Sequence, residues 1–171
     1  MTGLVFVDTN VLLYAVDTRE PAKHAVAREW MLGLWRDRTG RISVQVLSEF
    51  YANATRVQSP GLSPDQAWEH VAALADWRPQ AIDFAVLELG RQVQSRHGLS
   101  WWDSLIVAAA NRQNCVVLLT EDLQHGGVYA GVTAHNPFIA GIQESRARYA
   151  PTIEPRTMRG RGRPRKVEPV T

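Results

Sequence analysis

The sequence contains a single cysteine among its 171 residues, which excludes an internal disulfide and a cysteine-based zinc site. That residue, Cys115, precedes the apolar Val116 and Val117, so we expect a buried and inert thiol. The five histidines are dispersed, and no two lie three or four positions apart. A zinc site and a catalytic histidine pair are therefore not expected.

Long hydrophobic runs are also missing, because no stretch approaches the roughly 20 apolar residues that a membrane span needs. The first four residues lack the charged-then-apolar profile of a secretory signal. We therefore expect a cytoplasmic protein without a membrane partner. A glycine-rich phosphate loop and a Gly-x-Ser-x-Gly elbow are absent too, which weighs against nucleotide hydrolases and esterases.

What is present is enough apolar material for one core, since 45% of the residues are hydrophobic. Residues 4–7 and 116–119 are continuous apolar runs, typical of inner parallel strands that helices cover on both faces. Residues 41–43 and 132–135 are candidates for shorter strands. Segments with helical spacing lie between them, at residues 9–16, 21–38, 44–58, 64–77, 83–97 and 100–114. This order predicts an α/β fold, a three-layer α/β/α sandwich around a mainly parallel sheet.

The charge is divided unevenly along the chain. Residues 156–171 contain five Arg and one Lys against one Glu, a surplus of +5, so the net charge of +2 leaves −3 for residues 1–155. The last twenty or so residues are rich in Pro, Arg and Gly and have too little apolar surface to offset the entropy of ordering. We predict a domain at residues 1–149 and a flexible basic tail at residues 150–171.

Two acids follow the two apolar runs. Asp8 comes directly after residues 4–7, and Asp122 follows residues 116–119 by three positions. Open α/β sheets bind ligands at the carboxyl ends of their strands, and neighbouring strands lie about 4.8 Å apart. If the two strands are neighbours, both carboxylates face one crevice and repel each other unless a cation lies between them.

Two further acids fall on predicted helices. Asp103 opens a helix that is apolar on most sides, where an unpaired charge costs several kcal/mol, and metal coordination is one way to supply a partner. In the helix at 44–58, Glu49 and Asn53 lie on the flank of an apolar stripe, so Glu49 can reach a neighbouring cleft.

Each acid also has an ordinary structural explanation. Asp8 can be an N-cap, Asp122 a turn residue, Glu49 a solvated charge, and Ser100 with Asp103 a capping box. Four acids converging from two strand ends and two helices instead favour an oxygen-only cluster. Such a cluster suits a hard cation such as Mg²⁺ or Mn²⁺ rather than zinc.

These residues resemble the PIN domains, in particular the toxin ribonucleases of bacterial VapBC toxin–antitoxin pairs. The resemblance runs from about residue 4 to residue 136 and rests on four motifs in order. They are Asp-Thr-Asn at 8–10, Ser-Glu-Phe at 48–50, Trp-Asp-Ser-Leu-Ile-Val-Ala-Ala-Ala at 102–110 and Leu-Leu-Thr-Glu-Asp-Leu at 118–123.

The resemblance implies a Mg²⁺- or Mn²⁺-dependent endoribonuclease whose products carry 5′-phosphates and 3′-hydroxyls. It implies that the metal-binding catalytic acids are Asp8, Glu49, Asp103 and Asp122, and that Asn10 and Thr120 orient them. Glu121 adjoins Asp122 and is the alternative ligand, although the Thr two positions before Asp122 matches the family pattern. The resemblance further implies an RNA substrate, a cognate antitoxin protein that caps the site with a basic side chain, and a homodimer.

Two other features of the sequence have possible roles in nucleic-acid binding. Trp101 and Trp102 are candidates for base stacking, but adjacent tryptophans at a buried helix start are more often packing anchors. The tail segment 159–166, Arg-Gly-Arg-Gly-Arg-Pro-Arg-Lys, looks like an AT-hook for the minor groove of DNA. Its candidate nucleic-acid contacts are Arg161, Arg163, Arg165 and Lys166. They raise an alternative function, a nucleic-acid-binding or regulatory module with an inactive PIN-like core.

Overall fold

The computed structural model describes residues 3–56 and 61–139, and within them five strands form one sheet. Their order across the sheet is β2-β1-β3-β5-β4. The strands are β1 (Leu4–Val7), β2 (Gly40–Arg41), β3 (Cys115–Leu119), β4 (Val128–Tyr129) and β5 (Val132–His135). β1 pairs in parallel with β2 and β3, and β3 pairs in parallel with β5. The carboxyl ends of these strands therefore meet at one edge of the sheet.

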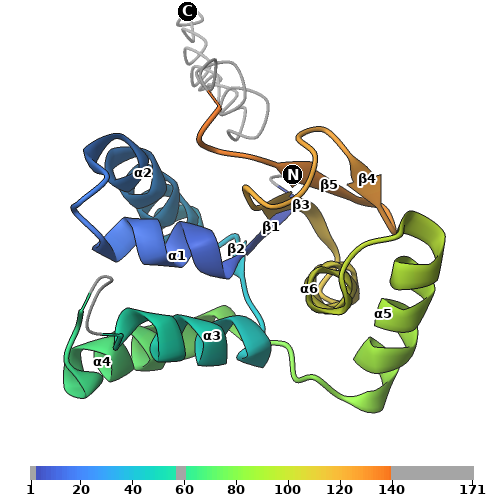
Figure 1. Ribbon diagram of the computed structural model, residues 1–171, viewed down its shortest axis with the longest axis horizontal. Helices are drawn as coiled ribbons and strands as arrows, with labels where there is room; N and C mark the ends of the chain where they lie inside the picture. The colour runs from blue at the N-terminus through green and yellow to red at the C-terminus, as the bar shows by residue number, and fades with distance from the viewer. Residues whose placement is uncertain (1–2, 57–60, 140–171) are drawn as a thin grey trace, which may run out of the picture.

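The helices occupy nearly the segments expected from apolar spacing. They are α1 (Thr9–Val16), α2 (Pro21–Asp37), α3 (Val44–Ala54), α4 (Pro64–Leu74), the 3₁₀ helix η1 (Ala75–Trp77), α5 (Phe84–His97) and α6 (Trp101–Arg112). In Figure 1, α1 to α4 lie on one side of the strands and α5 and α6 on the other. The predicted α/β sandwich with a mainly parallel sheet is confirmed.

One strand was not predicted. β4 is two residues long and pairs antiparallel with β5, Val128 opposite Thr133 and Tyr129 opposite Val132. A two-residue strand is too short to produce an alternating pattern, so the sequence contains no periodic signal for it.

Polar N-caps determine where most of the helices begin. The side chains of Asp8, Ser43, Ser63, Asp83 and Ser100 each accept a backbone N–H of the helix that follows. Such caps satisfy donors that have no partner inside the helix. The resulting boundaries place Asp8 at the junction of β1 and α1, and Asp103 in the first turn of α6.

The core lies between the sheet and its helices. Its largest fully buried side chains come from β1, β3, the segment after β2, and α3, namely Phe6, Leu118, Leu119, Ile42 and Phe50. Cys115 is also buried, and burial raises the pKa of its thiol to about 12, as expected for an inert cysteine.

A smaller apolar cluster joins α5 to α6, and it shows that only one of the two adjacent tryptophans is a packing anchor. Val86, Leu105 and Ala108 form this cluster, and Trp101 packs against it as the anchor hypothesis requires. Trp102 does not, because 62% of its surface is exposed. The interpretation of both tryptophans as packing anchors is therefore wrong for Trp102.

Several predicted features fall on residues outside the ranges 3–56 and 61–139. The predicted tail at 150–171, with its AT-hook residues Arg161, Arg163, Arg165 and Lys166, lies outside the described residues, as does Val57 near the end of the helix expected at 44–58. Among residues 3–56 and 61–139, no helix is both long and apolar enough to cross a membrane.

Candidate metal-binding active site

Asp8 lies at the centre of the candidate site, directly after β1 and at the N-cap of α1. Only 5% of its surface is exposed. Its Oδ1 accepts the backbone N–H of Thr9 at 2.6 Å, and its Oδ2 accepts the hydroxyl of Thr120 at 2.7 Å and the Nδ2 of Asn10 at 3.2 Å. The Asp8 side chain thus caps α1 and also lies near the other acids of the candidate site.

This environment raises the pKa of the Asp8 carboxyl from 3.8 to about 7. Burial is the largest cause, and the nearby carboxylates of Asp122 and Glu49 raise the pKa further, whereas the hydrogen bonds from Thr120 and Thr9 lower it. An ionised Asp8 is therefore costly unless a positive charge compensates it.

Asp122 reaches the same place from the loop after β3. Asn10 donates its Nδ2 to Asp122 Oδ2 at 2.9 Å, and the backbone N–H of Asp122 donates to Thr120 Oγ1 at 3.1 Å. Asn10 and Thr120 thereby contact both Asp8 and Asp122. These are the contacts expected of residues that orient the two carboxylates.

Glu49 approaches from α3. Its Oε2 accepts the hydroxyl of Thr9 at 2.8 Å and its Oε1 accepts Gln45 Nε2 at 3.0 Å. Thr9 and Gln45 were not predicted as site residues. The available signal for Gln45 was its position four residues before Glu49 on the same helix, where it is only 8% exposed.

Asp103 is placed differently from the other three acids. Its Oδ2 accepts the hydroxyl of Ser100 at 2.7 Å, and its backbone N–H donates to Ser100 Oγ at 3.1 Å, so it takes part in capping α6. The connection to the cluster runs through Gln45, whose Nε2 also donates to the carbonyl of Trp102 at 3.4 Å. Shared hydrogen-bond partners thus bring Asp8, Glu49 and Asp122 together. Asp103 is the residue that follows Trp102, whose carbonyl accepts the hydrogen bond from Gln45.

Glu121 faces away from the cluster toward α1 and α2. Its Oε2 pairs with Lys23 Nζ at 2.7 Å, and its Oε1 accepts the hydroxyl of Tyr14 at 2.8 Å. Lys23 Nζ also lies 4.2 Å from the centre of the Tyr14 ring. These contacts occupy Glu121, whereas Asp122 lies beside Asn10, which favours Asp122 as the ligand of the pair.

The side chains of the candidate site offer oxygen atoms to a metal ion. Within the described ranges, no three or more His, Cys, Asp or Glu side chains form a ready-made metal-binding group. Two buried amide oxygens, Asn10 Oδ1 and Gln45 Oε1, nevertheless have no hydrogen-bond partner among the described residues. Each belongs to an amide that contacts an acid of the cluster. Unpaired oxygen acceptors beside carboxylates are the donor chemistry of a hard divalent cation.

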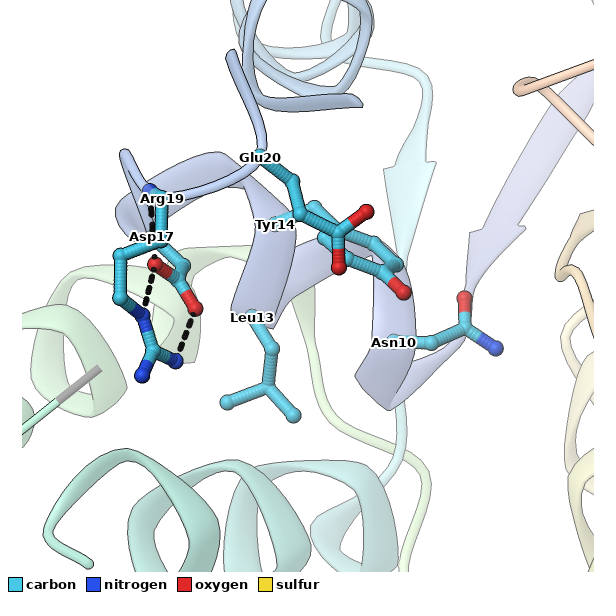
Figure 2. Close-up of a pocket in the computed structure, with 6 residues that line it drawn as sticks. All are labelled: Asn10, Leu13, Tyr14, Asp17, Arg19 and Glu20. Carbon is cyan, nitrogen blue, oxygen red and sulfur yellow. Dashed lines mark hydrogen bonds and ion pairs between the residues drawn. The ribbon is translucent and has the colours of Figure 1, made fainter. Parts of the chain in front are cut away.

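An open cavity of about 340 Å³ adjoins the cluster along α1. Figure 2 shows Asn10 at one end of this cavity and the Arg19–Asp17 pair at the other, with Tyr14, Leu13 and Glu20 between them. Arg19 Nη2 lies 2.6 Å from Asp17 Oδ2. Asn10 therefore contacts the acids on one side and lines the cavity on the other.

The fold also pairs two histidines that the sequence left apart. The rings of His125 and His135 have their centres 4.9 Å apart. Burial first, and then the neighbouring His125, lower the pKa of His135, which favours a neutral ring. A search for histidines three or four positions apart could not find this pair, because the two residues are ten positions apart in the sequence.

Together the mainly parallel sheet and the acids at its carboxyl edge define an α/β protein with an acidic site at the place where such sheets bind ligands. The PIN domain model matches residues 5–129. The chain therefore belongs to the PIN domain family.

A solved structure agrees with this fold. The chain is similar to the crystal structure of Mycobacterium tuberculosis VapC20, a toxin that cleaves the sarcin–ricin loop, with a TM-score of 0.55 and 20% sequence identity over 75% of this chain and 98% of that one. At this identity the likeness supports the fold. No curated protein sequence matches the chain significantly.

Proposed function

We propose that this PIN-domain protein is a divalent-metal-dependent endoribonuclease and the toxin of a type II toxin–antitoxin pair. The observation that carries the proposal is the environment of Asp8. This carboxyl is 5% exposed; it shares Asn10 with Asp122 and Thr9 with Glu49, so three acids converge where a bound cation would stabilise their ionised forms. Burial first, and then Asp122 and Glu49, raise its pKa to about 7, so without a cation only part of it is ionised at neutral pH.

The residues that would hold Mg²⁺ or Mn²⁺ are Asp8, Glu49, Asp103 and Asp122. Their oxygen-only chemistry suits these ions, and two amides that contact the acids, those of Asn10 and Gln45, each keep a buried oxygen without a hydrogen-bond partner among the described residues. A bound ion of this kind supplies Lewis-acid activation for hydrolysis of a phosphodiester.

The protein's own contribution is to hold the acids in position before substrate arrives. Thr9 restrains two of them, because its backbone N–H binds Asp8 and its hydroxyl binds Glu49. Thr120 restrains Asp8 through its hydroxyl and Asp122 through the latter's backbone N–H. Such supporting contacts commonly affect metal affinity or activity about 10- to 100-fold when removed.

The choice of RNA as substrate rests on family membership together with the fold shared with a toxin that cleaves the sarcin–ricin loop. In this proposal, a cognate antitoxin inserts a basic side chain toward the acids and so keeps RNA away from the site. The chain assembles as a homodimer, the commonest symmetric oligomer.

The proposal is tested by incubating the purified full chain, free of antitoxin, with transfer RNA and with a sarcin–ricin-loop hairpin, in Mg²⁺, Mn²⁺ or EDTA. Asp8→Asn serves as the inactive variant and Glu121→Gln as its matched control. We expect metal-dependent cleavage that leaves 5′-phosphates, is lost in Asp8→Asn and persists in Glu121→Gln. Cleavage at the parental rate by Asp8→Asn would refute the proposal.

A further inference from the structure

Trp102 is an exposed residue that lies beside the candidate active site and has no packing role in the core. Tryptophan is highly buried on average, yet 62% of this residue is exposed, while its neighbour Trp101 packs against the cluster between α5 and α6. The two adjacent tryptophans therefore divide their roles. Trp101 anchors the helix, so Trp102 lies on a backbone that this packing holds, with more than half of its own surface exposed.

The backbone of Trp102 is connected to the acidic cluster. Gln45 Nε2 donates both to the Trp102 carbonyl at 3.4 Å and to Glu49 Oε1 at 3.0 Å. Glu49 in turn accepts the hydroxyl of Thr9, whose N–H binds Asp8. Trp102 is also the sequence neighbour of Asp103, so its indole starts from a point fixed at the border of the candidate active site.

The two other aromatic residues that are more than half exposed in the described part of the chain, Trp68 and Phe84, have no described hydrogen bond to this cluster. Trp68 on α4 is 61% exposed, and its described ring contact is an edge contact with Tyr51 at 6.3 Å. Phe84, at the start of α5, is 72% exposed. Among the exposed large hydrophobic residues in the described part of the chain, Trp102 alone adjoins one of the four acids in sequence.

An aromatic ring at this border supplies what the acids cannot. Carboxylates repel a phosphate backbone, whereas a base stacks on an indole without regard to charge. Proteins that recognise RNA in single-stranded loops commonly splay out a base and stack it on an aromatic side chain. Stacking of one base on Trp102 would hold the strand beside the acids.

We propose that Trp102 is a substrate-binding residue that stacks on one unpaired nucleobase flanking the cleaved phosphodiester of RNA. This inference rests on the proposed ribonuclease function and adds to it a base-binding position. Because every base has a π-face, the position binds an unpaired nucleotide with little preference for its identity.

The test measures kcat/KM on the shortest RNA that the wild type cleaves, and on the same RNA with an abasic ribonucleotide at each position near the cut. Trp102→Ala is compared with Trp68→Ala, a matched control with the same residue type and nearly the same exposure. Trp102→Tyr retains an aromatic ring, whereas Trp102→Leu retains only apolar character.

We expect Trp102→Ala to lose about tenfold or more in kcat/KM on the intact RNA, mainly through KM, because stacking contributes to binding. One abasic position should cost the wild type a similar factor and cost Trp102→Ala almost nothing. Trp102→Tyr should recover most of the loss, while Trp102→Leu should not, and Trp68→Ala should behave as wild type.

Equal abasic penalties in wild type and Trp102→Ala, or full activity of Trp102→Leu, would overturn the inference while leaving the ribonuclease function intact. A Trp102→Ala variant that changes the oligomeric state and not the abasic penalty would assign the ring to a protein interface and also overturn it. If the wild type cleaves no RNA, the proposed function itself fails and the inference falls with it.

Discussion

At the scale of single residues, Asp8 combines a structural and a chemical demand. Its carboxyl caps α1 and is held by Thr120, yet burial and the neighbouring acids raise its pKa to about 7. In the metal-free protein the folded state therefore holds a proton on Asp8 over a pH range in which the unfolded chain has released it.

This difference predicts a pH dependence of stability. A raised folded-state pKa gives stability that is fully present below 3.8 and is lost as the pH rises to about 7. In EDTA, the free energy of unfolding of the wild type should therefore fall as the pH rises through this range. Asp8→Asn should lack the part of this fall that comes from Asp8. The check is urea unfolding of both proteins at pH 5 and pH 8. A fall in stability that is as steep in Asp8→Asn would contradict the assignment.

The choice between Glu121 and Asp122 gives a second prediction. Asp122→Asn should reduce cleavage at least tenfold, because Asp122 shares Asn10 with Asp8. Glu121→Gln should change it much less, since Glu121 is engaged by Lys23 and Tyr14. Steady-state cleavage rates of the two variants decide the matter. A larger loss of cleavage in Glu121→Gln than in Asp122→Asn would make Glu121 the ligand in place of Asp122.

The sequence placed Asp8 and Asp122 after two apolar strand runs, and the structure pairs these two strands in parallel. Asn10 and Thr120 were predicted from the family resemblance alone. Contacts between distant segments had no such signal. Lys23 and Glu121 are 98 positions apart, and only the packing of α2 against the loop after β3 brings them together. Long-range pairs of this kind depend on helix orientation, which periodicity alone does not determine.

At the scale of elements, substitution of Ser100 can distinguish the capping role of Asp103 at the start of α6 from its proposed catalytic role. Its hydroxyl accepts the N–H of Asp103 and donates to the Asp103 carboxylate. Ser100→Ala should lower the free energy of unfolding by about 1 kcal/mol, as loss of an N-cap does. Ser63→Ala, which removes the cap of α4, should do the same and is the matched control.

Cleavage then distinguishes the two roles of Asp103. Ser100→Ala should retain most of the activity, whereas Asp103→Asn should abolish it with little effect on the fold. The measurements are urea unfolding and initial cleavage rates. If Ser100→Ala lost as much activity as Asp103→Asn, the Asp103 side chain would act mainly through the helix cap.

Gly40 in β2 shows how closely one element is packed. A Cβ at this position would lie 2.6 Å from ring atoms of Trp77, which is only 4% exposed. Gly40→Ala should therefore destabilise the protein by about 1–3 kcal/mol through overpacking. Adding Trp77→Leu should cost less in the Gly40→Ala background than in wild type, measured by urea unfolding as a double-mutant cycle. Purely additive losses would contradict the predicted clash.

Element boundaries were largely predictable because apolar runs and capping residues mark them. Ser100 and Asp83 begin α6 and α5 within one residue of expectation. Trp102 was misassigned for a physical reason, since only one of two successive helical residues can face the cluster between α5 and α6. Which one faces it depends on the helix rotation that tertiary packing sets.

At the scale of the whole molecule, the uneven charge predicts different roles for the domain expected at residues 1–149 and the basic segment expected at residues 150–171. If residues 150–171 only add a basic segment, a chain truncated after Tyr149 should cleave RNA at the wild-type rate. It should also lose much of the salt-dependent binding to A·T-rich DNA that the AT-hook resemblance implies. Cleavage assays and DNA binding at two salt concentrations test this. Complete loss of cleavage on truncation would favour the alternative binding-module function.

The central claim is that the acids at the carboxyl edge of the sheet hold a divalent cation. The most direct test is an electron paramagnetic resonance titration of Mn²⁺ into the full-length wild type, Asp8→Asn and Glu121→Gln. We expect saturable binding in the wild type, its loss in Asp8→Asn and its retention in Glu121→Gln. Equal Mn²⁺ binding by the wild type and Asp8→Asn would contradict the account.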